Sequence, residues 1–146
     1  MPYKDASSTY KETKIKTAGQ GQLIVMLYDE AVRQLVKAIE ILELNKTDKD
    51  PGKIEQISKA VMKTEEIITE LMVSLDFDQG GEISKNLFSL YTWFNRELME
   101  ANITQDAARM KVVKSMLSEL RNSWNSISQM PVDQQNRGAV GLNIAG

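Results

Sequence analysis

Residues 24–42 read IVMLYDEAVRQLVKAIEIL, and this stretch decides the fold. Its apolar residues recur at steps of four and three, from Ile24 through Tyr28 and Leu35 to Leu42. This is the spacing of one face of an α-helix, and an apolar face of this length must be buried against other elements. The stretch therefore predicts a long helix that packs within a larger helical assembly.

The same spacing recurs three more times along the chain, with short polar or glycine-containing breaks between the series. Ala31 and Ala38 complete the first series. The second series is Ile54, Ile57, Val61, Thr64, Ile68, Leu71 and Leu75; the third is Ile83, Leu87, Leu90, Phe94, Leu98 and Ala101; the fourth is Met110, Val113, Leu117, Leu120, Trp124 and Ile127. Four amphipathic helices joined by short connections predict an all-α fold, an antiparallel up-down four-helix bundle.

Turn and capping signals place the helix ends. We expect helices over residues 18–44, 53–75, 82–101 and about 105–129. Thr17 and Gln20 have the spacing of a capping box for the first helix, and Thr104 is the expected N-cap of the last. The bundle then covers residues 17–130, preceded by a flexible, polar N-terminal arm (residues 1–16) and followed by a glycine-containing tail (residues 131–146) that we expect to be disordered.

The composition is that of one soluble domain. The chain has 146 residues, of which 42% are hydrophobic and 26% charged, with a net charge of -2 and a pI near 5.3. This balance gives no reason to expect binding to nucleic acid. The longest dense apolar run, from Leu23 to Tyr28, is far shorter than the roughly 20 residues that span a membrane, so we expect no membrane insertion. The N-terminus leads into polar residues rather than an apolar signal segment, so we expect a cytoplasmic protein.

The chain contains no histidine and no cysteine, which excludes most catalytic and metal-binding classes. We therefore expect neither an enzyme nor a metal or other cofactor. The stretch from Asp76 to Gly81 is similar to the start of a calcium loop, but Leu87 occupies the position of the required glutamate, so a helix-breaking turn is the better interpretation. Glu65 and Glu66 fall between apolar positions, which is more typical of a solvated face than of an acid–base pair.

Apolar residues beyond the four series are the remaining signal. They either widen the core or form an exposed patch of the kind that binds a partner protein. Eight methionines favour the second interpretation, because flexible, polarizable methionine suits surfaces that accept an amphipathic segment. The surplus comprises Met26, Val36, Ile39, Met62, Ile67, Met72, Phe88, Tyr91, Trp93, Met99, Val112 and Met116. We expect the binding surface to include Met62, Met72, Phe88, Met99, Val112 and Met116.

Several short segments, in the same order along the chain, resemble the FliS family of flagellar secretion chaperones, from about Tyr10 to Trp124. They are Leu23-Ile24-Val25-Met26-Leu27-Tyr28-Asp29, Ser74-Leu75-Asp76, Gly80-Gly81-Glu82-Ile83, Asn86-Leu87, Leu90-Tyr91, Glu100-Ala101-Asn102 and Glu119-Leu120-Arg121-Asn122-Ser123-Trp124. Two positions in the first predicted helix depart from the family pattern, at Gln20-Gly21-Gln22 and at Glu30. Both affect capping and surface rather than the expected core.

This resemblance implies a bacterial cytosolic chaperone. Members of the family bind the disordered C-terminal segment of flagellin, prevent premature polymerisation and deliver flagellin to the export gate protein FlhA of the flagellar type III apparatus. Tyr10 matches a tyrosine tied to gate docking in the family. We also expect Tyr10 and Ile15, in the arm, to cover part of the apolar surface when flagellin is absent.

Two other classes of function remain open. The same apolar surface is also compatible with a structural adaptor that self-associates, and a weak homodimer is compatible with either function. An enzyme is the least favoured class, because the sequence offers no histidine, cysteine or phosphate-binding motif.

Overall fold

The computed structural model of the chain describes residues 2–129, with side chains described from residue 20 onward. Within this range the chain folds into four α-helices and no strand: α1 (Pro2–Asp48), α2 (Pro51–Val73), α3 (Phe77–Thr104) and α4 (Ala107–Ser128). The predicted all-α class is confirmed. The predicted disordered tail lies outside the described residues.

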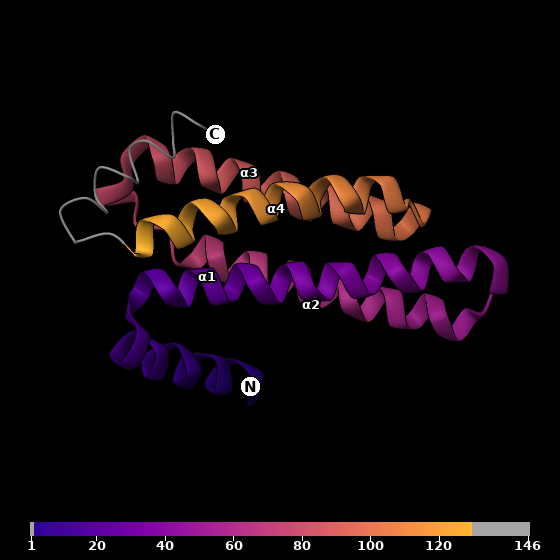
Figure 1. The fold of residues 1–146 in the computed structure, drawn as a ribbon, viewed down its shortest axis with the longest axis horizontal. Coiled ribbons are helices and arrows are strands. Elements are labelled where there is room, and N and C mark those ends of the chain that lie inside the picture. Colours follow the sequence, from indigo (N-terminus) through magenta and orange to yellow (C-terminus); the bar gives the residue numbers. More distant parts are fainter. Residues whose placement is uncertain (1, 130–146) are drawn as a thin grey trace.

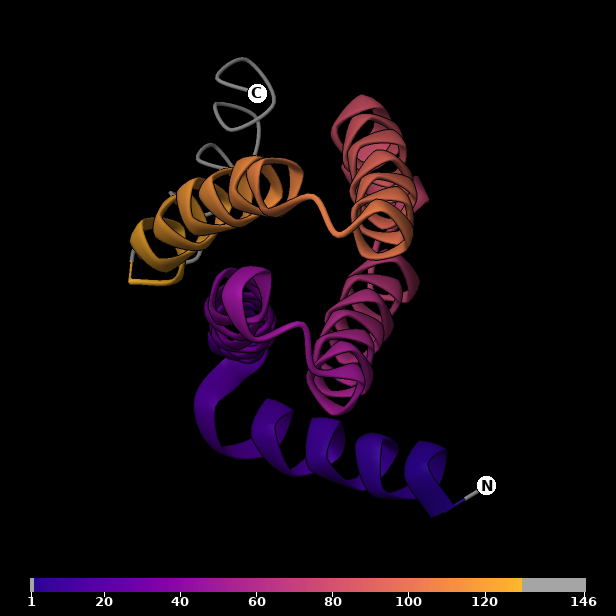
Figure 2. The same cartoon turned by 90° about the vertical axis from the view of Figure 1, so that its right-hand side faces the viewer.

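The helices are arranged as a closed ring of neighbours. α1 packs against α2 and α4, and α3 packs against the same two helices from the opposite corner (Figure 2). Connections of only two or three residues join successive helices, so each runs antiparallel to the one before it (Figure 1). This is the predicted up-down four-helix bundle.

The core contains most of the predicted apolar series. Its largest fully buried side chains come from all four helices: Tyr28, Leu35, Ile57, Val61, Ile68, Leu71, Tyr91, Phe94, Leu98, Met110, Val113 and Leu117. Thr64, which fills one position of the second series, is also fully buried, and its hydroxyl donates to the Ala60 carbonyl at 2.9 Å. A buried threonine therefore continues the apolar face of α2 without leaving its hydroxyl unpaired.

Four residues differ from the prediction of which apolar side chains form the core and which are surplus to it. Ile54 is 45% exposed, whereas Ile39, Ile67 and Tyr91 are buried in the core. Ile54 lies in the first turn of α2, where the bundle ends. The three others lie beside a series position on their own helices, so the buried stripe is wider than one residue per turn.

The helix ends show which capping predictions were wrong. The N-cap of α4 is Asp106, whose carboxylate accepts from the Arg109 backbone N–H at 3.2 Å. Thr104 instead ends α3, where its hydroxyl donates to the Glu100 carbonyl at 2.8 Å. α1 continues helically through Thr17 back to Pro2, so Thr17 is not its N-cap. Helix-forming lysines, glutamate and alanine follow Pro2, and proline suits a first helical turn.

The expected break at residues 76–81 is shorter than predicted. α2 ends at Val73, and Asp76 caps α3 by accepting from the backbone N–H groups of Asp78 and Gln79, each at 3.0 Å. Gly81 then interrupts α3 with φ 51° and ψ -122°, a conformation that glycine adopts with little strain. The prediction of a helix-breaking turn was therefore correct. The turn consists of an N-cap at Asp76 followed by a kink at Gly81.

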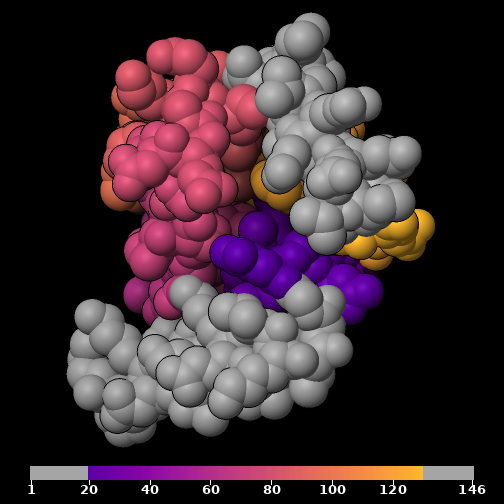
Figure 3. Space-filling view, turned by 90° about the vertical axis from the view of Figure 1, so that its left-hand side faces the viewer, coloured from indigo at the N-terminus to yellow at the C-terminus, as the bar shows by residue number. Residues whose placement is uncertain are grey.

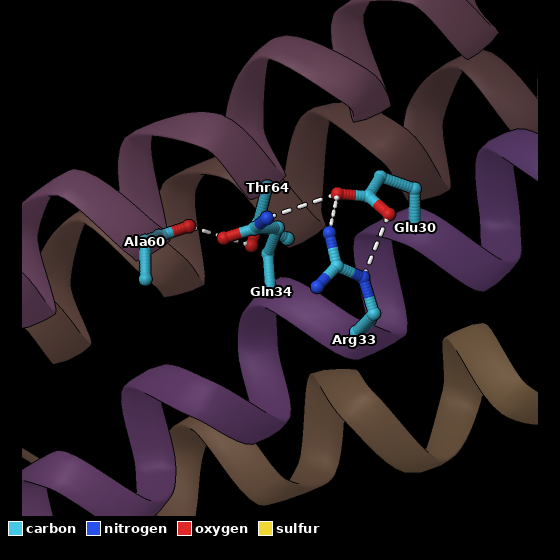
Figure 4. A network of polar contacts seen from close by, with 5 residues as sticks. All are labelled: Glu30, Arg33, Gln34, Ala60 and Thr64. Atoms are coloured by element: carbon cyan, nitrogen blue, oxygen red, sulfur yellow. Dashed lines mark hydrogen bonds and ion pairs between the residues drawn. The ribbon is translucent and has the colours of Figure 1, made fainter.

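A polar network lies between α1 and α2 (Figure 4). The Arg33 guanidinium donates to Glu30 at 2.6 and 2.9 Å, and buried Gln34 donates to the same carboxylate at 2.9 Å. The hydrogen bond from Arg33 is the main cause that lowers the pKa of Glu30. The buried Gln34 amide therefore has a hydrogen-bond partner on its own helix.

Candidate functional site

Exposed large apolar side chains concentrate on one pair of helices. Nine such residues occur among the described side chains, and seven of them belong to α2 or α3. The exceptions are Leu44 on α1 and Val112 on α4. The seven are Ile54, Met62 and Val73 on α2, and Phe77, Phe88, Met99 and Ile103 on α3.

Two hydrogen bonds between side chains set the register of α2 against α3. The Ser58 hydroxyl donates to Asn102 Oδ1 at 3.3 Å, and Asn95 Nδ2 donates to the Thr69 hydroxyl at 3.4 Å. The two helices are antiparallel, so along the bundle axis residue numbers increase on α2 in the direction in which they decrease on α3. These two bonds therefore mark two levels along the same side of the bundle.

The exposed methionines fall between these two levels. Met62 lies one turn beyond Ser58, and Met99 lies one turn beyond Asn95. Residues four apart on a helix share a face, so Met62 and Met99 lie near each other between the two helices. Both side chains are about half exposed, at 57% and 49%.

A second apolar pair lies beyond the Thr69–Asn95 level. Val73 is one turn after Thr69, and Phe88 is two turns before Asn95. Phe88 also contacts Phe77 edge to face, with ring centroids 6.0 Å apart. We call the set Met62, Val73, Phe77, Phe88 and Met99 the α2/α3 face.

A polar gap separates the two apolar pairs of the α2/α3 face. Thr69 and Asn95 form its centre, and Glu65 lies one turn before Thr69. The Thr69 hydroxyl donates to the Glu65 backbone carbonyl at 2.9 Å. Partial burial, followed in importance by the neighbouring charge of Glu66, raises the pKa of Glu65. The face thus contains an incompletely solvated carboxyl group.

The other sides of the bundle are bridged by charge. Between α1 and α4, Lys111 pairs with Glu43 at 2.5 Å and Arg121 pairs with Asp29 at 2.7 Å. The Lys111 ammonium lowers the pKa of Glu43. In contrast, α2 and α3 share no ion pair among their described side chains. The α2/α3 face is therefore the side of the bundle where apolar side chains, rather than ion pairs, meet solvent.

Side chains between α3 and α4 form a less exposed seam. Arg109 pairs with Glu97 there at 3.4 Å. Trp93 and Met116 are partly buried against the core, whereas Val112 is exposed. This seam therefore offers less free apolar surface than the α2/α3 face.

The structure brings together three of the six residues predicted for partner binding. Met62, Phe88 and Met99 lie on the α2/α3 face. Met72 and Met116 pack partly against the core, and Val112 is exposed on α4. The side chains of Tyr10 and Ile15 lie outside the described ones.

Val73 and Phe77 belong to the α2/α3 face but were absent from the prediction. Phe77 falls within the stretch interpreted as a break between helices, where helical spacing was not considered. Val73 lies one turn beyond Thr69, which would have placed it on the face if the contact between Thr69 and Asn95 had been known. Sequence periodicity alone does not reveal such a contact.

A cavity of about 700 Å³ lies at the end of the bundle where α2 ends and α3 begins, and Figure 3 faces this end. Side chains from all four helices line it, including Ile24, Leu71, Ile83 and Trp124. Among residues 20–129 no group of three or more acidic side chains is placed to hold a metal ion. None of the four helices, over the part of the chain described, is long and apolar enough to cross a membrane.

Comparison with known families gives an assignment. The family model "Flagellar protein FliS" matches residues 3–131, which is most of the chain. The chain belongs to the FliS family. The match extends over all four helices of the bundle, so the α2/α3 face lies within the FliS region.

Curated FliS proteins support the same assignment. The Flagellar secretion chaperone FliS of Salmonella typhimurium is 36% identical over 127 residues, covering 86% of this chain and 89% of its own length. The Flagellar secretion chaperone FliS of Escherichia coli is 31% identical over 113 residues, with 77% and 79% covered. That of Bacillus subtilis is 24% identical over 129 residues, with 88% and 90% covered. The similarity therefore spans most of each FliS protein.

Proposed function

We propose that this FliS-family chain is a flagellar secretion chaperone that binds the disordered C-terminal segment of flagellin on its α2/α3 face. Binding there prevents premature polymerisation, and the complex delivers flagellin to the export gate protein FlhA from the bacterial cytosol. Family membership and the names of the relatives support the chaperone role. The observation that favours this face is the concentration of exposed apolar side chains on the side where the described side chains of α2 and α3 form no ion pair with each other.

The physical basis of the proposed function is coupled folding and binding. A disordered apolar segment has no partner for its own apolar side chains, and ordering it costs conformational entropy. Met62, Met99, Val73 and Phe88 offer apolar surface along α2 from Met62 to Val73, a length of about 16 Å at 1.5 Å per residue. Methionine side chains adapt to a bound surface at little steric cost. Met72, Val112 and Met116 are proposed as further contacts next to this face.

Calorimetric titration with the C-terminal flagellin peptide of the same organism tests the proposal. We expect binding with a large negative heat-capacity change, because apolar surface is buried. The Met62→Ser/Met99→Ser variant should bind at least about tenfold more weakly, while its stability changes little because both side chains are exposed. Leu44→Ser, an equally exposed apolar residue on α1, is the matched control and should bind normally.

The results separate this proposal from its alternatives. Absence of binding by folded protein would reject flagellin as cargo. Equal weakening by Met62→Ser/Met99→Ser and by Leu44→Ser would reject the α2/α3 face. A stable dimer in sedimentation, dissociated by Met62→Ser/Met99→Ser, would favour the self-associating adaptor instead.

The N-terminal arm is proposed to dock at FlhA through Tyr10 and Ile15 and to cover part of the apolar surface in the absence of flagellin. Deletion of residues 1–16 should then increase the fluorescence of a dye that binds exposed apolar surface. Unchanged dye fluorescence would contradict the covering role. Tyr10→Ala should weaken FlhA binding by the flagellin complex without affecting flagellin binding itself.

A further inference from the structure

The polar gap of the α2/α3 face contains two hydrogen-bond acceptors to which no side chain of residues 20–129 donates. Asn95 Oδ1 is buried and has no hydrogen-bond partner among the described residues. The Glu65 carboxylate is partly buried and forms no ion pair or hydrogen bond with any side chain described in the structure. An unpaired buried acceptor is costly, and the partly buried carboxylate beside it also has no partner, so the site is incomplete.

The two lysines nearest to Glu65 along α2 interact with other carboxylates. Lys59 pairs with Glu55 at 3.5 Å, one turn along its own helix. Lys63 acts on Glu30 of α1, where its charge contributes to lowering the pKa of that carboxyl group. Across the gap on α3, the position facing Thr69 is the neutral Asn95. Among the side chains that the structure describes, no lysine or arginine forms an ion pair with Glu65.

The gap lies midway along the apolar surface. Met62 is three residues before Glu65, and Val73 is eight residues after it. A segment that covers both apolar pairs must pass over Glu65 and Asn95 between them. It would bury these two acceptors further unless it supplied a donor at that point.

We propose that Glu65 and Asn95, with Thr69 positioning Asn95, form a recognition site for one lysine or arginine side chain in the middle of the apolar segment that the α2/α3 face binds. This deepens the proposed function and rests on it. The site selects a segment with a cation flanked by apolar residues about one turn before it and one to two turns after it. Segments with an acidic or apolar residue at that position are rejected, because they leave the carboxylate buried and unpaired.

Charge also argues against a second copy of the chain as the occupant. A symmetric pairing through the α2/α3 face would bring the Glu65 side chains of both copies into the same apolar interface. Like charges buried together are unfavourable. A segment from another protein that supplies a lysine or arginine avoids this cost.

Glu65→Gln is the variant that tests the site. We expect it to bind the C-terminal flagellin peptide about tenfold more weakly, with an unfolding free energy equal to or above that of the wild type, because a partly buried charge has been removed. Glu66→Gln is the matched control: the same change at the adjacent, exposed residue should leave binding unaltered. Glu65→Lys should reduce binding further, and one lysine- or arginine-to-glutamate substitution in the peptide should restore it.

The outcomes distinguish this site from the function on which it rests. Loss of binding with Met62→Ser/Met99→Ser but wild-type binding with Glu65→Gln would refute the recognition site and leave the face intact. Wild-type binding by both variants would refute both. A lower stability of Glu65→Gln, or failure of every charge-reversed peptide to rescue Glu65→Lys, would mean that Glu65 has a structural role and would also refute the site.

Discussion

Tyr28 of α1 and Tyr91 of α3 are joined by a hydrogen bond between their buried hydroxyl groups. These helices occupy opposite corners of the bundle, so this bond connects them across the core. A buried hydroxyl that loses one hydrogen-bond partner is destabilising, whereas the removal of both hydroxyls of a bonded pair costs less than the two single losses together. The two tyrosines should therefore behave as a coupled unit.

Single substitutions test this coupling. Tyr28→Phe or Tyr91→Phe alone should lower the unfolding free energy by about 1–3 kcal/mol, because the remaining hydroxyl is left buried. The double variant should lose clearly less than the sum of the two single losses. Urea unfolding of the four proteins measures the coupling, and strictly additive losses would contradict it.

The same pair predicts sensitivity to alkaline pH. Burial raises the pKa of Tyr91 to about 12 and raises the pKa of Tyr28 well above its ordinary value. Above about pH 10 the unfolded chain loses phenolic protons that the folded chain retains, so the unfolding free energy falls as pH rises. The expected slope between pH 10 and 12 is at most about 1.4 kcal/mol per pH unit for each tyrosine.

The Tyr28→Phe/Tyr91→Phe variant is the control for this pH effect. It retains the lysines, which also titrate in this range, but lacks both buried phenols. Its unfolding free energy should fall less steeply between pH 10 and 12 than that of the wild type. Parallel profiles for the two proteins would show that other groups cause the pH dependence.

At the scale of the helices, periodicity predicted the existence, number and order of the elements, because each must bury one apolar stripe. It predicted their ends less well. Thr104 and Asp106 are both good N-cap residues, and the choice between them depends on which one leaves the helical conformation. In the structure Gln105 adopts the left-handed conformation that ends α3, which places Asp106 at the start of α4.

Two substitutions separate the alternative caps of α4. Asp106→Ala should lower the unfolding free energy by about 1 kcal/mol, because the Arg109 backbone N–H loses its acceptor. Thr104→Ala should be close to neutral, because its hydroxyl only donates to a carbonyl of its own helix. Thermal unfolding measures both, and a larger loss for Thr104→Ala would contradict this assignment of the cap.

For the whole molecule, the sequence predicted that surplus apolar residues exist but not where they gather. Met62, Phe88 and Met99 come together only because Ser58, Thr69 and their partners fix the register of α2 against α3. Tyr91 has a similar apolar character in sequence yet is buried, since it occupies the inner side of α3. Buried and exposed apolar residues lie only one or two positions apart along the same helix. The periodicity of a single sequence does not determine which of them faces the core.

The distribution of charge completes this picture. Ion pairs connect α4 to α1 and α3, whereas the α2/α3 face has apolar side chains around a polar gap. Individual surface ion pairs contribute little to stability. Their relevance here is their distribution, because they lie on other sides of the bundle than the apolar α2/α3 face. A chaperone needs such a side free, because its cargo must be covered and later released.

The proposed binding of flagellin to the α2/α3 face is tested most directly by amide hydrogen exchange with and without the C-terminal flagellin peptide. We expect added protection on binding in α2 around residues 58–73 and in α3 around residues 84–102, with little change in α1 opposite them. Protection confined to α1 and α4, or no change at peptide concentrations that saturate binding, would contradict it.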